Sequence, residues 1–159
     1  MNTQITFDMS AVESIIAQRK AMPGAMLPIL HGIQEAVGYI PPEVVQLIAQ
    51  ELNVSRAEVH GVVTYYHHFR QTPPGRHVVQ VCRAEACQAL GGDALAAHAK
   101  AMLSCDFHET TADGAFTLEP VYCLGQCACG PAIMIGDDLH ARVSSDKLNR
   151  LLDAKRGAQ

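Results

Sequence analysis

The chain of 159 residues lacks any uninterrupted stretch of about 20 apolar residues, so no segment is expected to cross a membrane. Residues 1–8 have neither the positive charge nor the apolar stretch of a secretory signal, which predicts a cytoplasmic protein. Lys and Arg total 12 against 16 Asp and Glu, and the basic residues are scattered. Without a basic stripe, nucleic acid is not expected as a partner.

Patterns of catalysis and nucleotide binding are also missing. The sequence has no G-x-G-x-x-G fingerprint, no phosphate-binding glycine loop and no Ser/His/Asp set. We therefore expect no catalytic site, and no nucleotide or flavin site, in this chain alone. His60, His67 and His68 have no Cys or Asp nearby to complete a metal site, so an exposed or helix-capping role is expected for them.

What the sequence does contain is enough apolar material for a buried core, since 48% of its residues are hydrophobic. The segment 71–75, Gln-Thr-Pro-Pro-Gly, interrupts regular structure and separates a half without cysteine from a half that holds all six. We predict two domains, residues 1–74 and residues 75–159.

The first half predicts four amphipathic helices in a small bundle, because apolar residues recur at helical spacing throughout it. The bounds come from recognisable start and stop residues: a capping box at Ser10 and Glu13 with an end near Ala21, Gly38 after the second helix, Pro41 and Pro42 before the third, and a second capping box at Ser55 and Glu58.

The second half mixes both periods and predicts the order β-α-β-β-β-α, with helices packed on a sheet. The expected elements are a strand at 77–81 leading into Cys82, a helix at 91–103, a strand at 116–122, a hairpin of 132–135 and 139–143 around a three-residue loop, and a helix from Ser144-Ser145 to about Ala154. The chain as a whole is predicted to be an α+β protein.

Four of the cysteines form two pairs, Cys82-x4-Cys87 and Cys123-x3-Cys127, and each pair follows a predicted strand. A [2Fe–2S] cluster requires such a set, because each iron takes two thiolates. In a reducing compartment, cysteines more often serve as metal ligands or redox groups than as disulfides. The spacing therefore predicts a [2Fe–2S] cluster held by these four residues.

Three other interpretations use the same cysteines. Zinc would take the same four thiolates, although structural zinc sites usually pair cysteines as C-x2-C, and the spacing alone leaves zinc open. A dithiol oxidoreductase needs a C-x-x-C motif, which is absent, and disulfides need an oxidising compartment. Of the two cysteines left over, Cys105 is expected to be a half-buried hydrophobic residue. Cys129 is expected to be a neighbour of the cluster or a substitute ligand.

Residues around the cysteines are expected to support them. Gly91-Gly92, Gly125 and Gly130 allow the backbone to come close to sulfur and to donate hydrogen bonds, and Pro131 helps to fix the second loop. Arg83 is a candidate cation beside the cluster, with a solvated surface position as its alternative.

Beyond these patterns, the sequence resembles the thioredoxin-like [2Fe–2S] subunits of NADH dehydrogenases and related complexes, including the small flavoprotein-fragment subunit of respiratory complex I. The resemblance spans nearly the whole chain. It is carried by segments 23–40, 63–69, 74–76, 81–82, 87–92, 123–127 and 130–132.

The resemblance implies a thioredoxin-like domain in which Cys82 and Cys87 bind one iron and Cys123 and Cys127 the other, and it favours the cluster over zinc. It also implies docking on a flavin- and NAD-binding subunit. Within the family, segments 82–87 and 127–129 are most similar to the gamma subunit of soluble, molybdenum-dependent NAD-linked formate dehydrogenases. That likeness implies a further iron–sulfur and molybdenum subunit as partner. Complex I and the diaphorase part of NAD-linked hydrogenases are the alternative host complexes.

Overall fold

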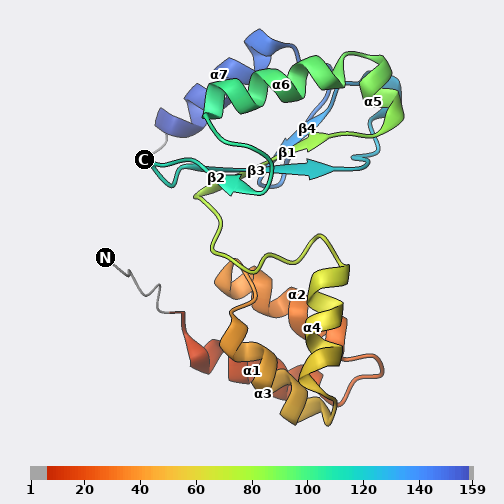
Figure 1. Cartoon of the computed structure of the whole chain (residues 1–159), viewed down its shortest axis with the longest axis vertical. Coiled ribbons are helices and arrows are strands. Elements are labelled where there is room, and N and C mark those ends of the chain that lie inside the picture. Colours follow the sequence, from red (N-terminus) through yellow and green to blue (C-terminus); the bar gives the residue numbers. More distant parts are fainter. Residues whose placement is uncertain (1–6, 158–159) are drawn as a thin grey trace. The chain divides into compact units, whose positions relative to one another are not determined.

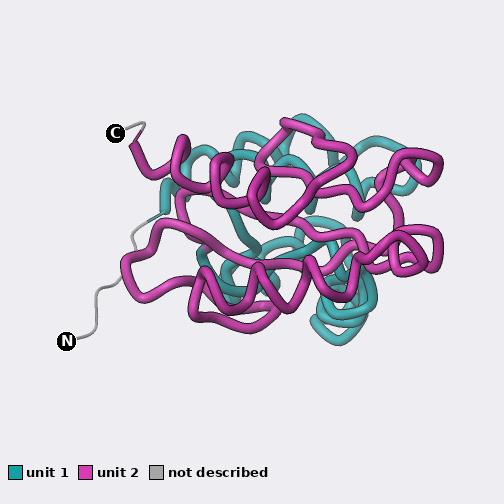
Figure 2. Tube along the Cα trace, turned by 90° about the horizontal axis from the view of Figure 1, so that it is seen from above, with its two compact units in different colours: residues 1–73 teal, residues 74–159 magenta. Residues whose placement is uncertain are grey.

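The computed structural model describes residues 7–157 of the chain, which divides into two compact units, residues 1–73 and residues 74–159 (Figures 1 and 2). The first unit is helical and the second combines a sheet with helices. Within the described range, no helix combines the length and the apolar character needed to cross a membrane.

The first unit contains the four predicted helices. Gly38 ends the second helix in a left-handed conformation, with φ 92°, and its N–H donates to the carbonyl of Gln34. Pro42 opens the third helix, where the missing N–H of proline costs no hydrogen bond. The helices are α1 (Met9–Arg19), α2 (Met26–Val37), α3 (Pro42–Leu52) and α4 (Arg56–Tyr65).

The two predicted capping boxes have different outcomes. At α4 the prediction is confirmed: the Ser55 hydroxyl accepts the N–H of Glu58, and the Glu58 carboxylate accepts the N–H of Ser55 at 2.8 Å. At α1 it is wrong, because Asp8 is the cap and its carboxylate accepts both the N–H and the hydroxyl of Ser10. The helix begins at Met9, so Ser10 lies inside its first turn and donates to the cap instead of acting as one.

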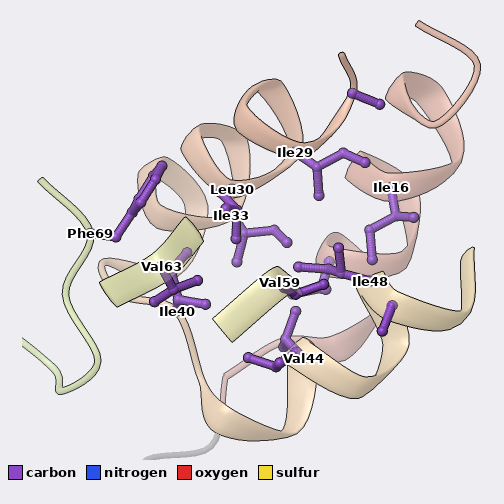
Figure 3. Close-up of a cluster of buried hydrophobic side chains, with 14 residues drawn as sticks. Ile16, Ile29, Leu30, Ile33, Ile40, Val44, Ile48, Val59, Val63 and Phe69 are labelled. Atoms are coloured by element: carbon purple, nitrogen blue, oxygen red, sulfur yellow. The ribbon is translucent and has the colours of Figure 1, made fainter. Parts of the chain in front are cut away.

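The core of the first unit lies between all four helices, and Figure 3 shows its largest side chains pointing toward one another. The side chain of Gln34 (6% exposed) ties the segment after α4 to this core. Its amide donates to the carbonyl of His68 at 2.8 Å and accepts the N–H of Arg70 at 2.7 Å. The fully buried core residues include Ile16, Ile29, Leu30, Ile33, Ile40, Val44, Ile48 and Val59.

The second unit is built on a five-stranded sheet with the strand order β2-β3-β1-β4-β5. β1 runs parallel to β3, and the other pairs are antiparallel. The register sets Cys82 opposite Val121 and Val81 opposite Ile133, so β1 and β3 end, and β4 begins, at one edge. The strands are β1 (His77–Cys82), β2 (Glu109–Thr110), β3 (Phe116–Val121), β4 (Ile133–Ile135) and β5 (Asp138–His140).

Two longer helices, α6 (Gly92–Leu103) and α7 (Ser145–Gly157), contact each other and lie on one face of the sheet (Figure 1). Leu95 and Ala99 of α6 and Leu148 and Leu152 of α7 are buried in one core with the strands. Ser144 caps α7, as predicted, by accepting the N–H of Lys147 at 3.2 Å.

The α+β class is confirmed, and three short elements were not predicted: β2, the helix α5 (Glu85–Ala89) and the 3₁₀ turn η1 (Cys127–Cys129). The prediction of a three-residue hairpin loop is wrong. Ile135 pairs with Asp138, which leaves a two-residue loop. Gly136 has φ 60°, and its freedom at positive φ permits this tighter turn.

Candidate metal centre

The first cysteine pair is held at the sheet edge where β1 ends. The N–H of Cys82 donates to the carbonyl of Ala132 at 3.0 Å, and the N–H of Arg83 donates to Val121 at 2.7 Å. The two neighbouring strands therefore fix the chain on either side of Cys82. Cys87 follows in α5, and both cysteines are 2% exposed.

Close backbone packing positions the Cys87 side chain. A Cβ on Gly92 would lie 2.7 Å from the carbonyl oxygen of Cys87, and one on Gly130 would lie 3.3 Å from its Sγ. Burial raises the pKa of the Cys87 thiol, and its hydrogen bond with the Cys82 thiol raises it further. The backbone N–H of Ala132 donates to the same sulfur and opposes that shift. The predicted close approach to sulfur is confirmed for Gly130, whereas Gly92 approaches the backbone of Cys87 and a Cβ on Gly91 would meet nothing within 4 Å.

The second pair follows β3 and is exposed to solvent. The Sγ atoms of Cys123 and Cys127 lie 3.7 Å apart, and this hydrogen bond is the largest cause that raises the pKa of Cys127. Gly125, at φ 75°, donates its N–H to Cys123 Sγ at 3.3 Å. The predicted backbone donation from Gly125 to sulfur is confirmed.

The two pairs lie near each other at the same edge of the sheet. Charge repulsion between the pairs adds to the burial and hydrogen bonding described above. Cys82 raises the pKa of Cys127, and Cys127 raises the pKa of Cys87. In residues 7–157 no three or more His, Cys, Asp or Glu side chains gather closely enough to hold one metal ion. The sulfurs instead form two pairs, Cys82 with Cys87 and Cys123 with Cys127.

The two remaining cysteines, Cys105 and Cys129, are both half-buried. Cys105 is half-buried against the core of the second unit, which confirms its expected role as a small hydrophobic residue. Cys129 ends η1, where its N–H donates to Gln126 and its carbonyl accepts the N–H of Arg142. None of the six cysteines forms a disulfide.

The other candidate residues have partners of their own. Arg83 pairs with the carboxylate of Asp93 at 3.0 Å, so the expected cation beside the cluster already has an acidic partner. The exposed ring of His68 lies against that of His31, with 5.1 Å between their centres. Burial lowers the pKa of His68, and the neighbouring His31 lowers it further.

Two thiol pairs fit a [2Fe–2S] cluster, since each iron takes two thiolates. When bound, the cluster supplies one-electron oxidation and reduction. The residues around the two pairs suit such a group: the N–H groups of Ala132 and Gly125 donate to the sulfurs of Cys87 and Cys123, while burial of Cys82 and Cys87 disfavours added negative charge. Fold and site together define an iron–sulfur electron-transfer protein.

The comparisons with known proteins give the particular family. The model of the thioredoxin-like [2Fe-2S] ferredoxins matches residues 12–156, and the chain belongs to this family. It carries a [2Fe–2S] cluster, so the predicted family and cofactor are confirmed and zinc is set aside.

Two relatives are similar to this chain over most of their own length. The E 2 subunit of the NADH-quinone oxidoreductase of Rhizobium meliloti (strain 1021) is 36% identical over 148 residues, which cover 93% of this chain and 88% of the relative. The HndA subunit of the NADP-reducing hydrogenase of Solidesulfovibrio fructosivorans is 33% identical, over 81% of this chain and 75% of the relative.

Among solved structures, the fold is shared with the NAD⁺-reducing [NiFe]-hydrogenase in its air-oxidized state. The TM-score is 0.70 at 21% identity, over 88% of this chain. This chain spans 24% of the length of that hydrogenase chain, and the likeness concerns the fold alone.

Proposed function

We propose that Cys82 and Cys87 bind one iron of the cluster, and that Cys123 and Cys127 bind the other. The pairing of the sulfurs supports this assignment, because the two thiols of each pair are hydrogen-bonded to each other. Cys127 is preferred to Cys129 as the partner of Cys123, because the Sγ atoms of Cys123 and Cys127 lie 3.7 Å apart.

In function, the chain is a one-electron transfer subunit of an NAD-linked, multisubunit oxidoreductase in the cytoplasm. It exchanges electrons with the flavin of a partner subunit that binds NAD. The observation that carries this proposal is the unequal burial of the two pairs. Cys123 and Cys127 bring ligand sulfur to the surface, where a partner can approach, whereas Cys82 and Cys87 are closed off. The names of the relatives, an NADH-quinone oxidoreductase and an NADP-reducing hydrogenase, support the link to nicotinamide cofactors.

For the host complex we propose an NAD-dependent formate dehydrogenase, in which the chain is the gamma subunit beside an iron–sulfur and molybdenum catalytic subunit. The residues that support this proposal are segments 82–87 and 127–129, with Cys129 as their most distinctive member. The second candidates are respiratory complex I and an NAD-linked hydrogenase diaphorase, which the similarity to the NADH-quinone oxidoreductase relative and to HndA favours.

Metal and sulfide analysis of anaerobically purified protein tests the cluster. About two irons and two acid-labile sulfides per chain are expected, whereas one zinc without sulfide would contradict the electron-transfer function. Purification of the chain with its natural partners tests the host complex. Molybdenum and formate-dependent NAD reduction in the purified complex are expected. A complex with nickel, or one with quinone reductase activity and no molybdenum, would replace formate dehydrogenase with the corresponding alternative.

A further inference from the structure

A short segment between β5 and α7, residues 141–143, runs beside the turn that carries Cys127; we call it the strap. The N–H of Arg142 donates to the carbonyl of Cys129 at 2.8 Å, and the N–H of Val143 donates to Pro131 at 3.0 Å. Through these two bonds the strap holds the backbone that directly follows Cys127.

The two ends of the strap are secured differently. Val143 is 2% exposed and packs in the core of the second unit. The other end is less buried: Ala141 is half-buried, and Arg142 is an exposed residue in the left-handed region, with φ 50°, which residues with a Cβ rarely adopt. Arg142 and Val143 both border an open cavity of about 460 Å³. Packing therefore fixes Val143 but gives less support to Ala141 and Arg142.

Lys147 holds the Ala141 end of the strap. Its Nζ donates to the carbonyl of Ala141 at 2.7 Å, and the contact is partly buried. The backbone N–H of Lys147 donates to Ser144, so the residue is fixed in the capped first turn of α7. A charged donor on a helix thereby holds the Ala141 end of the strap.

We propose that Lys147 is a positioning residue for the cluster. It acts through the strap: Lys147 fixes Ala141, the next residue Arg142 holds Cys129, and Cys129 closes the turn that presents Cys127. The role rests on the proposed assignment of Cys127 as a ligand. Without the ammonium group, the turn keeps its sequence and its cysteine but loses the fixed donor that holds it in place.

The test compares three variants of the full chain with the cluster bound. Lys147→Met removes the donor and keeps the aliphatic stem, and Lys147→Arg restores a donor. Lys155→Met is the matched control, because it removes the same charge from the same helix while its ammonium pairs with Asp138 and not with the strap. The measurements are the rate of iron release to a chelator, the electron paramagnetic resonance spectrum of the reduced protein, and the thermal midpoint.

We expect Lys147→Met to release iron about fivefold faster, the change that one lost hydrogen bond makes in an equilibrium, and to show a broadened resonance spectrum. Lys147→Arg and Lys155→Met should match the wild type in both. An unchanged release rate and spectrum in Lys147→Met would overturn the proposal, and so would equal effects in Lys147→Met and Lys155→Met. A wild-type spectrum in Cys127→Ser would instead contradict the ligand assignment.

Discussion

Burial separates the two cysteine pairs residue by residue. Cys82 and Cys87 are each 2% exposed, whereas Cys123 and Cys127 are exposed. A thiolate in a buried position is costly without a cation beside it, so under the proposed assignment the iron balances the charge of the first pair. The same pair is therefore the more sensitive place to test the ligand assignment.

Replacing Cys82 by alanine is expected to abolish the cluster, because it leaves one iron with a single thiolate. Cys105→Ala is the matched control: it removes a half-buried thiol from the same unit, outside the sulfur pairs, and should retain the cluster. Iron and sulfide content with the visible absorption spectrum checks both. An intact two-iron spectrum in Cys82→Ala would rule the assignment out.

Gly92 is expected to be irreplaceable by alanine. A Cβ there would lie 2.7 Å and 2.9 Å from the carbonyl oxygen and carbon of Cys87, and backbone atoms cannot rotate away. Overpacking of this kind costs about 1–3 kcal/mol of the free energy of unfolding, and here it also displaces a proposed ligand. Urea unfolding and iron content measure the two effects.

The control for Gly92→Ala is Gly61→Ala in α4, where an added Cβ meets nothing within 4 Å. Alanine is the better helix former by about 1 kcal/mol, so Gly61→Ala should raise the free energy of unfolding. If both variants changed stability in the same direction, the close contact at Gly92 would not be the cause.

Spacing predicted which cysteines form pairs, but not which pair is buried. Cys82 and Cys123 lie at the ends of neighbouring strands, and the difference arises because Ala132, the residue before β4, packs against the first pair. The strap was also not predicted. Its contacts join residues 142 and 143 to residues 129 and 131, and neither segment has a periodic pattern that would reveal the pairing.

At the level of elements, length decided what the sequence could predict. Helices of ten or more residues have an apolar stripe several turns long, and all four in the first unit were predicted. β2 has two residues, η1 three and α5 five. Segments this short do not show the alternating pattern of a strand or the repeating apolar stripe of a helix. The cap of α1 was assigned to Ser10, because Asp8 and Ser10 are both capping residue types and the pattern does not show which of them begins the helix.

The capping box of α4 should make stability depend on pH. Hydrogen bonds from the backbone and then the hydroxyl of Ser55 lower the pKa of Glu58 in the folded state. The unfolded state therefore binds more protons in acid, and the stabilisation by Glu58, complete above about pH 4.3, is lost as the pH falls through the lowered folded pKa.

The measurement is urea unfolding of the wild type and Glu58→Gln between about pH 6 and about pH 3. The wild type should lose more free energy of unfolding than Glu58→Gln as the pH falls. Any contribution of the cluster to the pH dependence is common to both proteins and cancels in the difference. A difference that stays constant with pH would contradict this role of Glu58.

At the scale of the whole molecule, the chain separates helical packing from redox chemistry. The first unit has its own core and contains no cysteine, whereas the second holds all six cysteines, the strap and Lys147. Each unit closes its own hydrophobic core, which is what a domain needs to fold alone. We therefore propose residues 1–74 and residues 75–159 as independent domains.

The last prediction follows from that division: residues 75–159, expressed alone, should bind the cluster. All four proposed ligands lie within this segment, and so do the N–H donors of Gly125 and Ala132 and the covering helices α6 and α7. Because a smaller domain buries a smaller share of its surface, its thermal midpoint should be lower than that of the full chain. Analysis should give about two irons and two sulfides, with the resonance spectrum of the full chain. If the isolated segment folded but held no iron while the full chain did, the helical unit would be part of the metal centre, and the proposed division would be wrong.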